Sequence, residues 1–163
     1  IDIALQVSSA LAAAENQGLV HRDLKPANLM FVAAAPDAND SSPGKAEKAD
    51  TVVKVIDFGV AKALVEKPDA MGLTHGGFVG TPAFASPEQF TDAPVDVRSD
   101  IYSLGVTLWY LLTGHMPFGD RVLKGLDERP AVVRPPIEQL KAAGVPPRFS
   151  ALLVAMLAIE PAA

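Results

Sequence analysis

The ten residues HRDLKPANLM, at positions 21–30, decide how the rest of the chain is interpreted. They place a carboxylate (Asp23), an ammonium group (Lys25) and an amide (Asn28) close together. A carboxylate accepts the proton of an attacking hydroxyl, an ammonium neutralises charge on a transferred group, and an amide oxygen is a hard ligand for magnesium. Taken alone, the stretch is equally typical of a surface turn, because Asp, Asn and Lys-Pro are frequent in turns.

A second acidic motif, IDFG at 56–59, removes much of that ambiguity. Two short apolar runs rich in β-branched residues, 29–33 and 52–56, predict a strand pair. This hairpin would bring Asp57 near Asn28, so that two oxygen ligands from adjacent loops suit one magnesium ion. An Asp-Phe-Gly turn is frequent by chance, but both motifs in this order around one hairpin are not. The pattern therefore favours phosphoryl transfer.

The remaining sequence predicts a mainly helical plan. Apolar spacing predicts a helix over 2–17 that Gly18 stops and a buried helix over 100–112 that Gly114 and Pro117 end. Weaker signals predict a short helix at 87–90 begun by Pro87, helical patches near 121–128 and 136–143, and a last helix over 151–159 capped by Ser150. Polar residues 34–50 and the glycine-rich stretch 60–85 are predicted loops.

Composition limits the class of protein. A chain of 163 residues with 49% hydrophobic and 20% charged residues is typical of one globular domain with a real core. A net charge of −5 argues against nucleic acid or an anionic membrane as the main partner. The absence of cysteine excludes disulfides, thiolate metal sites and a cysteine nucleophile. No apolar run is long enough to span a bilayer, and the longest, 101–114, is interrupted by polar residues and glycine.

Four motifs, in this order, resemble those of the eukaryotic-type (Hanks-type) serine/threonine protein kinases, and they are similar to the bacterial members. They are HRDLKPANLM (catalytic loop), IDFGVAK (metal-binding motif), GTPAFASPEQF at 80–90 (end of the activation segment) and DIYSLGVTLWYLLTG at 100–114 (central buried helix). The resemblance runs from residue 1 to 161. It implies a mainly α (α+β) fold: residues 1–163 would form a partial kinase domain, the C-terminal lobe with one small β-hairpin, interrupted by a flexible insertion at 34–50.

The resemblance assigns catalytic and metal-binding roles to four side chains. It implies that Asp23 orients the substrate hydroxyl and accepts its proton, and that Lys25 contacts the γ-phosphate of ATP. The DLKP context of that lysine resembles the serine/threonine-specific class. Asn28 and Asp57 would hold the Mg²⁺ ions that accompany ATP.

Other residues receive binding and supporting roles by the same resemblance. Met30 matches a position that packs beneath adenine, although a methionine in an apolar strand is also typical of plain core. Thr81 matches a threonine that bonds to the catalytic aspartate and lysine, although Gly-Thr-Pro is also an ordinary turn. Structural support is implied for His21, Phe58, Gly59, Glu88 and Asp100, the last through bonds to the backbone near His21 and Arg22.

Arg22 and Thr74 are predicted to regulate the site. An arginine beside the catalytic aspartate can bind a phosphate on the activation loop bidentately. Thr74 is the only hydroxyl residue between Asp57 and Gly80, so it is the one phosphoacceptor that this loop offers. We expect phosphorylated Thr74 to order residues 60–79 through Arg22; the alternative is an unmodified loop residue.

The chain also departs from the family pattern. It holds no Gly-rich loop, strand lysine or helix glutamate, so the N-terminal lobe is expected to lie outside it and the isolated chain to be inactive and loosened. Glu88 pairs in the family with an arginine near the end of the lobe; the closing IEPAA has none, and we expect Glu88 to lack that partner. Ser86 stands where many members have alanine, and the loop at 34–50 is longer than the usual tight turn.

The predicted function is transfer of the γ-phosphoryl group of MgATP to Ser/Thr hydroxyls of protein substrates, once an N-terminal lobe completes the cleft. The alternative is a non-catalytic kinase-like binding module or a truncated inactive fragment. Degenerate kinases often lose one of the catalytic-loop or metal-binding residues, and here all are present. A small-molecule phosphotransferase is disfavoured because residues 80–90 resemble a peptide-docking loop. The expected location is the cytoplasm, or the cytoplasmic face of a membrane if the full-length protein is anchored.

Overall fold

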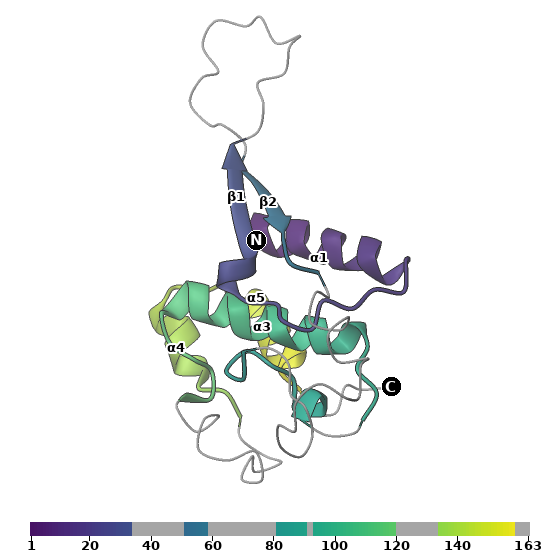
Figure 1. Cartoon of the computed structure of the whole chain (residues 1–163). Helices are drawn as coiled ribbons and strands as arrows, with labels where there is room; N and C mark the ends of the chain where they lie inside the picture. Colours follow the sequence, from purple (N-terminus) through teal and green to yellow (C-terminus); the bar gives the residue numbers. More distant parts are fainter. Residues whose placement is uncertain (34–50, 59–80, 91–92, 120–133, 159–163) are drawn as a thin grey trace, which may run out of the picture.

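The computed structural model describes residues 1–33, 51–58, 81–90, 93–119 and 134–158 (Figure 1). Its elements, in chain order, are α1 (Asp2–Glu15), η1 (Pro26–Asn28), β1 (Leu29–Ala33), β2 (Thr51–Val55), η2 (Pro87–Phe90), α3 (Val97–Thr113), α4 (Ile137–Ala142) and α5 (Pro147–Met156). The described part is thus mainly helical with one small sheet, as predicted. The loop at 34–50, most of the loop at 60–85 and the helical patch at 121–128 lie outside the described residues.

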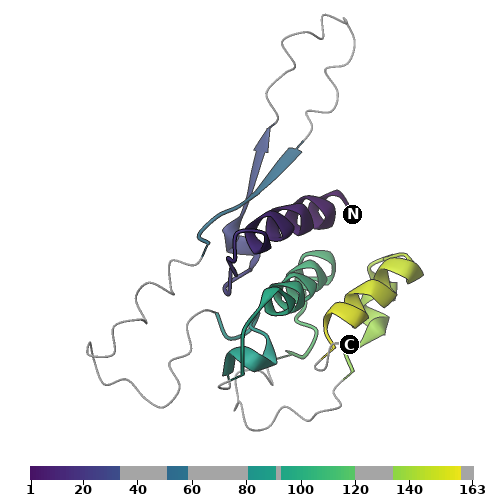
Figure 2. The ribbon, with the colours of Figure 1, turned by 90° about the vertical axis from the view of Figure 1, so that its right-hand side faces the viewer.

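The two strands form the predicted antiparallel hairpin, in a register that pairs Leu29 with Val55 and Ala33 with Thr51. β2 begins and ends one residue earlier than the predicted run at 52–56. Leu29 and Val53 are buried in the core cluster, and β2 packs against α1. Figures 1 and 2 show the hairpin rising beside α1, away from α3. This places the end of β2, where Asp57 follows, next to the start of β1.

Helix α1 supports β2 through a side-chain amide. The Gln6 Oε1 atom accepts a hydrogen bond from the Val53 N–H at 2.8 Å, and its Nε2 donates to the Thr51 carbonyl at 3.1 Å. A side-chain amide carries both an acceptor oxygen and a donor NH₂ group, so it pairs with a strand edge much as a neighbouring strand would. The helix itself is two residues shorter than predicted, because the chain turns at Gly18, whose φ of +70° favours glycine.

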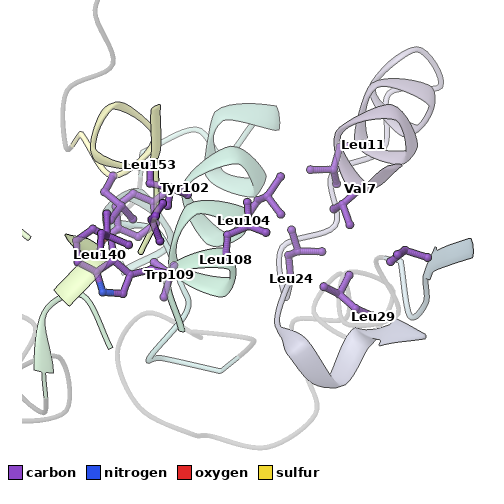
Figure 3. Packing of buried hydrophobic residues seen from close by; sticks show 14 residues of the cluster. Val7, Leu11, Leu24, Leu29, Tyr102, Leu104, Leu108, Trp109, Leu140 and Leu153 are labelled. Carbon is purple, nitrogen blue, oxygen red and sulfur yellow. The ribbon is translucent and has the colours of Figure 1, made fainter. Parts of the chain in front are cut away.

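Helix α3 is the centre of the packing. Figure 3 shows its Leu104 and Leu108 between two groups of side chains, one from α4 and α5 and one from α1, the catalytic loop and β1. It begins three residues before the predicted start because the Asp96 side chain caps it by accepting from the Arg98 N–H at 2.8 Å. It ends as predicted at Gly114, which adopts a left-handed φ of +71°.

The C-terminal helices correct one prediction. Ser150 was predicted to cap a helix over 151–159, but α5 begins at Pro147, and the buried Ser150 lies inside it. Proline suits the first helical position, where its missing N–H would have no helical partner, so the Pro146-Pro147 pair marks a start rather than a loop. α4 lies within the predicted 136–143, and PEQF is a 3₁₀ helix. Among the described residues, none of the helices has both the length and the apolar character to cross a membrane.

Gly105 tests how tightly α3 packs on α5. A Cβ at this position would lie 3.0 Å from the Met156 Cβ and 3.3 Å from Leu157 Cδ2. Helix propensity alone favours Gly105→Ala by about 1 kcal/mol, whereas overpacking costs about 1–3 kcal/mol. We therefore expect the variant to lose about 1 kcal/mol of unfolding free energy in urea titrations. A variant as stable as the wild type, or more stable, would show that this contact is not tight.

Candidate active site

The catalytic loop is anchored to α3 by a buried carboxylate. Asp100, 2% exposed in the first turn of α3, accepts the backbone N–H of His21 at 2.7 Å and that of Arg22 at 2.8 Å. Burial raises the pKa of Asp100 above its ordinary value, and the two N–H donors partly offset that rise. Arg22 adopts a φ of +67°, which costs a non-glycine residue about 1–3 kcal/mol and persists only when its surroundings hold it. The hydrogen bond to Asp100 is one of the contacts that hold Arg22 in this conformation.

His21 links the loop to the residues that follow β2. Its Nε2 lies 2.9 Å from the Ile56 carbonyl, and its Nδ1 lies 3.3 Å from the Asp23 N–H. Donation at Nε2 and acceptance at Nδ1 match one neutral tautomer. The ring also packs against Phe58, with centroids 4.8 Å apart. The structure thus gives this histidine a supporting position with both ring nitrogens engaged.

Asp23, Lys25 and Thr81 form a closed triangle of polar contacts. The Lys25 Nζ lies 2.7 Å from Asp23 Oδ2 and donates to Thr81 Oγ1 at 2.7 Å. The Thr81 N–H donates to the other carboxylate oxygen, Oδ1, at 2.8 Å. Between the two charged residues, Leu24 is fully buried in the core and holds their backbone in place. Two segments far apart in sequence therefore meet at one carboxylate.

The environment of Asp23 favours its ionised form. Partial burial works against ionisation, but the hydrogen bond and positive charge of Lys25, together with the Thr81 N–H, outweigh it and hold the pKa of Asp23 below the ordinary value. Because the folded-state pKa lies below the unfolded one, the carboxylate adds to stability above pH of about 3.9. That contribution is lost as the pH falls through the folded-state pKa.

Asn28 and Asp57 are brought to the same edge of the site. The Asn28 Nδ2 donates to the Asp23 carbonyl at 2.8 Å, which leaves its side-chain oxygen as the atom that can ligate a cation. The Ile56 N–H donates to the Asn28 carbonyl at 3.0 Å, so the residue before Asp57 touches Asn28. Asp57 is exposed, with a φ of +62°. Hard oxygen donors of this kind, completed by water and phosphate oxygens, fit Mg²⁺.

Met30 is 47% exposed on β1 beside Asn28, so the alternative of a plain core methionine is wrong. Its neighbour Phe31 is exposed as well. An apolar surface at this place suits contact with a flat aromatic ligand or another part of the protein. The contact with adenine stays a prediction.

Glu88 has a partner that sequence reasoning missed. Its Oε1 accepts the Ser99 hydroxyl at 2.5 Å, which ties η2 to the first turn of α3. The structure thus gives Glu88 a hydroxyl partner, since a carboxylate near the start of a helix finds hydroxyl and N–H donors there. The expected lack of an arginine partner stays a prediction. Gly59 and Thr74 lie outside the described residues.

Arg22 and Gln89 complete the site. The Arg22 Nε is buried and has no hydrogen-bond partner in the described part of the chain, while the Arg22 carbonyl accepts from Gln89 Nε2 at 2.6 Å. Sequence reasoning missed Gln89 as well. The sequence signal for Gln89 was that a polar residue directly follows Ser-Pro-Glu. The residues around it show no periodic pattern.

Comparison with known proteins gives this geometry its family. A family model described as "Protein kinase domain" matches residues 1–162. The chain belongs to the protein kinase family. Among curated kinases, it is 39% identical over 168 residues to serine/threonine-protein kinase pkn3 of Myxococcus xanthus, covering 99% of this chain and 28% of that protein.

Two further bacterial kinases show similar identity. Serine/threonine-protein kinase Pkn1 of Myxococcus xanthus is 44% identical over 125 residues, covering 76% of this chain and 16% of its own. PknL of Mycobacterium tuberculosis is 39% identical over 158 residues, covering 96% and 34%. The chain thus spans about a sixth to a third of the length of these relatives, and it is a bacterial-like member of the eukaryotic-type kinases.

The kinase site allows a direct test of what sets the ionisation of Asp23. Lys25→Met removes the ammonium but leaves the carboxylate partly buried, so the pKa of Asp23 should rise. The measurement is an NMR titration of ¹³C-labelled aspartate carboxyl groups. Lys141→Met, which breaks an exposed ion pair with Glu138, is the matched control and should leave the pKa of Asp23 unchanged. An unchanged pKa of Asp23 in Lys25→Met would contradict the assignment of Lys25 as its main partner.

Proposed function

We propose that this chain is the C-terminal lobe of a serine/threonine protein kinase, which transfers the γ-phosphoryl group of ATP to hydroxyl groups of proteins. In this proposal an N-terminal lobe elsewhere in the full-length protein completes the ATP cleft. The observation that carries it is the Asp23 carboxylate held between the Lys25 ammonium and the Thr81 N–H. The names of the relatives support the serine/threonine class.

The ionisation of Asp23 defines what it contributes. A carboxylate whose pKa is held low is a weak base at neutral pH, so its main task is to accept a hydrogen bond from the substrate hydroxyl and aim it. Phosphoryl transfer asks for little covalent chemistry from the protein, so positioning is the dominant contribution. The proton passes to Asp23 late, when the attacking oxygen has become acidic. Lys25, already bridging to Thr81, neutralises charge on the transferred group.

The cofactor roles follow from the remaining side chains. Mg²⁺ neutralises phosphate charge when it is bound, and Asn28 and Asp57 supply hard oxygen ligands for it. Among the described residues, no three His, Cys, Asp or Glu side chains gather as a metal site. The exposed Met30 supplies an apolar surface for the adenine ring. We place the reaction on the cytoplasmic side of any membrane, where ATP is abundant.

Asp23→Asn in the full-length protein tests the proposal. The amide keeps the shape of the carboxylate but does not orient the substrate hydroxyl or accept its proton as the carboxylate does. The kcat should therefore fall by about 10³-fold. The KM for ATP should change little. Glu138→Gln, at an exposed residue of α4, is the control and should retain full activity. A wild-type protein that transfers no phosphate to any Ser/Thr peptide would instead favour a non-catalytic binding module.

Regulation through Arg22 and Thr74 belongs to the same proposal. A buried guanidinium Nε without a partner among the described residues is costly, and a phosphate would satisfy it with a charge-assisted bond. We expect mass spectrometry of the active protein to find phosphate on Thr74, and Thr74→Ala to lower kcat about tenfold. An active protein with unmodified Thr74 would remove this part of the proposal and leave the catalytic part intact.

A further inference from the structure

Segment 81–90 touches the catalytic loop at a second point besides Thr81. At that point the Gln89 side chain donates from Nε2 to the Arg22 carbonyl at 2.6 Å. Its Oε1 accepts both the backbone N–H of Ser86 at 3.0 Å and the Ser86 hydroxyl at 3.2 Å. Ser86 is fully buried. We call these two side chains and the Arg22 carbonyl the Ser86–Gln89 clasp.

The clasp acts on the peptide unit that carries Asp23. The carbonyl of that unit is bonded to Gln89, and its N–H, which belongs to Asp23, lies 3.3 Å from the Nδ1 of His21. A peptide unit is planar, so a partner on each edge fixes the orientation of the whole plane. Together with the φ of Asp23, that orientation sets the direction of the Asp23 side chain from its Cα.

The backbone before this peptide unit is disfavoured and needs support. Arg22 has a φ of +67°, a conformation that a non-glycine residue keeps only when its surroundings over-determine it. Asp100 holds the Arg22 N–H, and Gln89 holds the Arg22 carbonyl. Without Gln89, only the contact on the N–H edge of this peptide unit remains, and the unit is free to rotate about that contact.

We propose that Gln89 is a positioning residue for Asp23, and that it makes the aim of the catalytic carboxylate depend on the seating of segment 81–90. This inference rests on the proposed function, in which Asp23 orients the substrate hydroxyl. When segment 81–90 moves, Asp23 loses the Thr81 N–H from its side chain and the Gln89 amide from its backbone together. The buried Ser86 hydroxyl has its use here, because it gives the Gln89 oxygen a second donor and so fixes which end of the amide faces Arg22.

The test compares two variants of the full-length protein. Gln89→Met keeps the length of the side chain and removes the amide, so kcat should fall about tenfold, the factor expected from losing a buried hydrogen bond and the aim it supports. The KM for ATP should stay within about twofold. The control, Gln139→Met, removes a different amide, the acceptor for Trp109 Nε1 at 2.9 Å. This control should retain kcat within about threefold.

A second readout does not depend on activity. The pKa of Asp23, followed by NMR of labelled aspartate, should move upward in Gln89→Met because a misaimed carboxylate makes poorer contacts with Lys25 and Thr81. It should stay at the wild-type value in Gln139→Met. Thermal unfolding of each variant separates this effect from simple loss of stability.

The outcomes distinguish the two proposals. If the wild type transfers no phosphate, the proposed function fails, and the titration of Asp23 still decides the role of Gln89. If Gln89→Met lowers the melting temperature but leaves both kcat and the pKa of Asp23 as in the wild type, the clasp is only structural and the inference is wrong. If Gln89→Met does not fold, Gln89→Leu is measured in its place with the same expected results. Should neither fold while Gln139→Met does, Gln89 serves folding and the inference is likewise overturned.

Discussion

The structure depends on one buried carboxylate, that of Asp100. It stands on the central helix and receives the backbone N–H groups of His21 and Arg22, so it ties the catalytic loop to the core of the domain. A buried carboxylate without donors would be expensive, and a catalytic loop without an acceptor would leave two N–H groups unpaired. Each requirement is met by the other, and the left-handed Arg22 is held as a consequence.

Around this connection, backbone groups do most of the positioning and side chains do the chemistry. His21 and Gln89 hold the peptide unit before Asp23, and the Thr81 N–H holds one oxygen of its carboxylate. Leu24, buried between Asp23 and Lys25, separates the reactive face of the loop from the face that packs on the core. A short loop can therefore be precise because nearly every polar group beside the reactive ones has a fixed partner.

The sequence allowed the main elements to be predicted where a local signal exists. The β-branched runs around the insertion predicted the hairpin, and the apolar stretch closed by Gly114 predicted the central helix. The start of α5 was missed because Ser150, a good capping residue by type, was interpreted as the start signal in place of the Pro146-Pro147 pair. Gln6, Gln89 and Ser99 were also missed, because a polar side chain that pairs with a distant residue leaves no periodic trace in the sequence.

The separation in sequence between the catalytic loop and Asp100 also affects how the protein folds during its synthesis. Asp100 follows His21 by 79 residues, so a ribosome adding about 5–20 residues per second exposes the catalytic loop several seconds before its anchor emerges. During that interval the loop has no means of holding Arg22 in its left-handed conformation. Closing so long a loop is also slow, so the reactive arrangement is among the last parts to form. A nascent or partly folded chain therefore carries every catalytic residue without the geometry to use it.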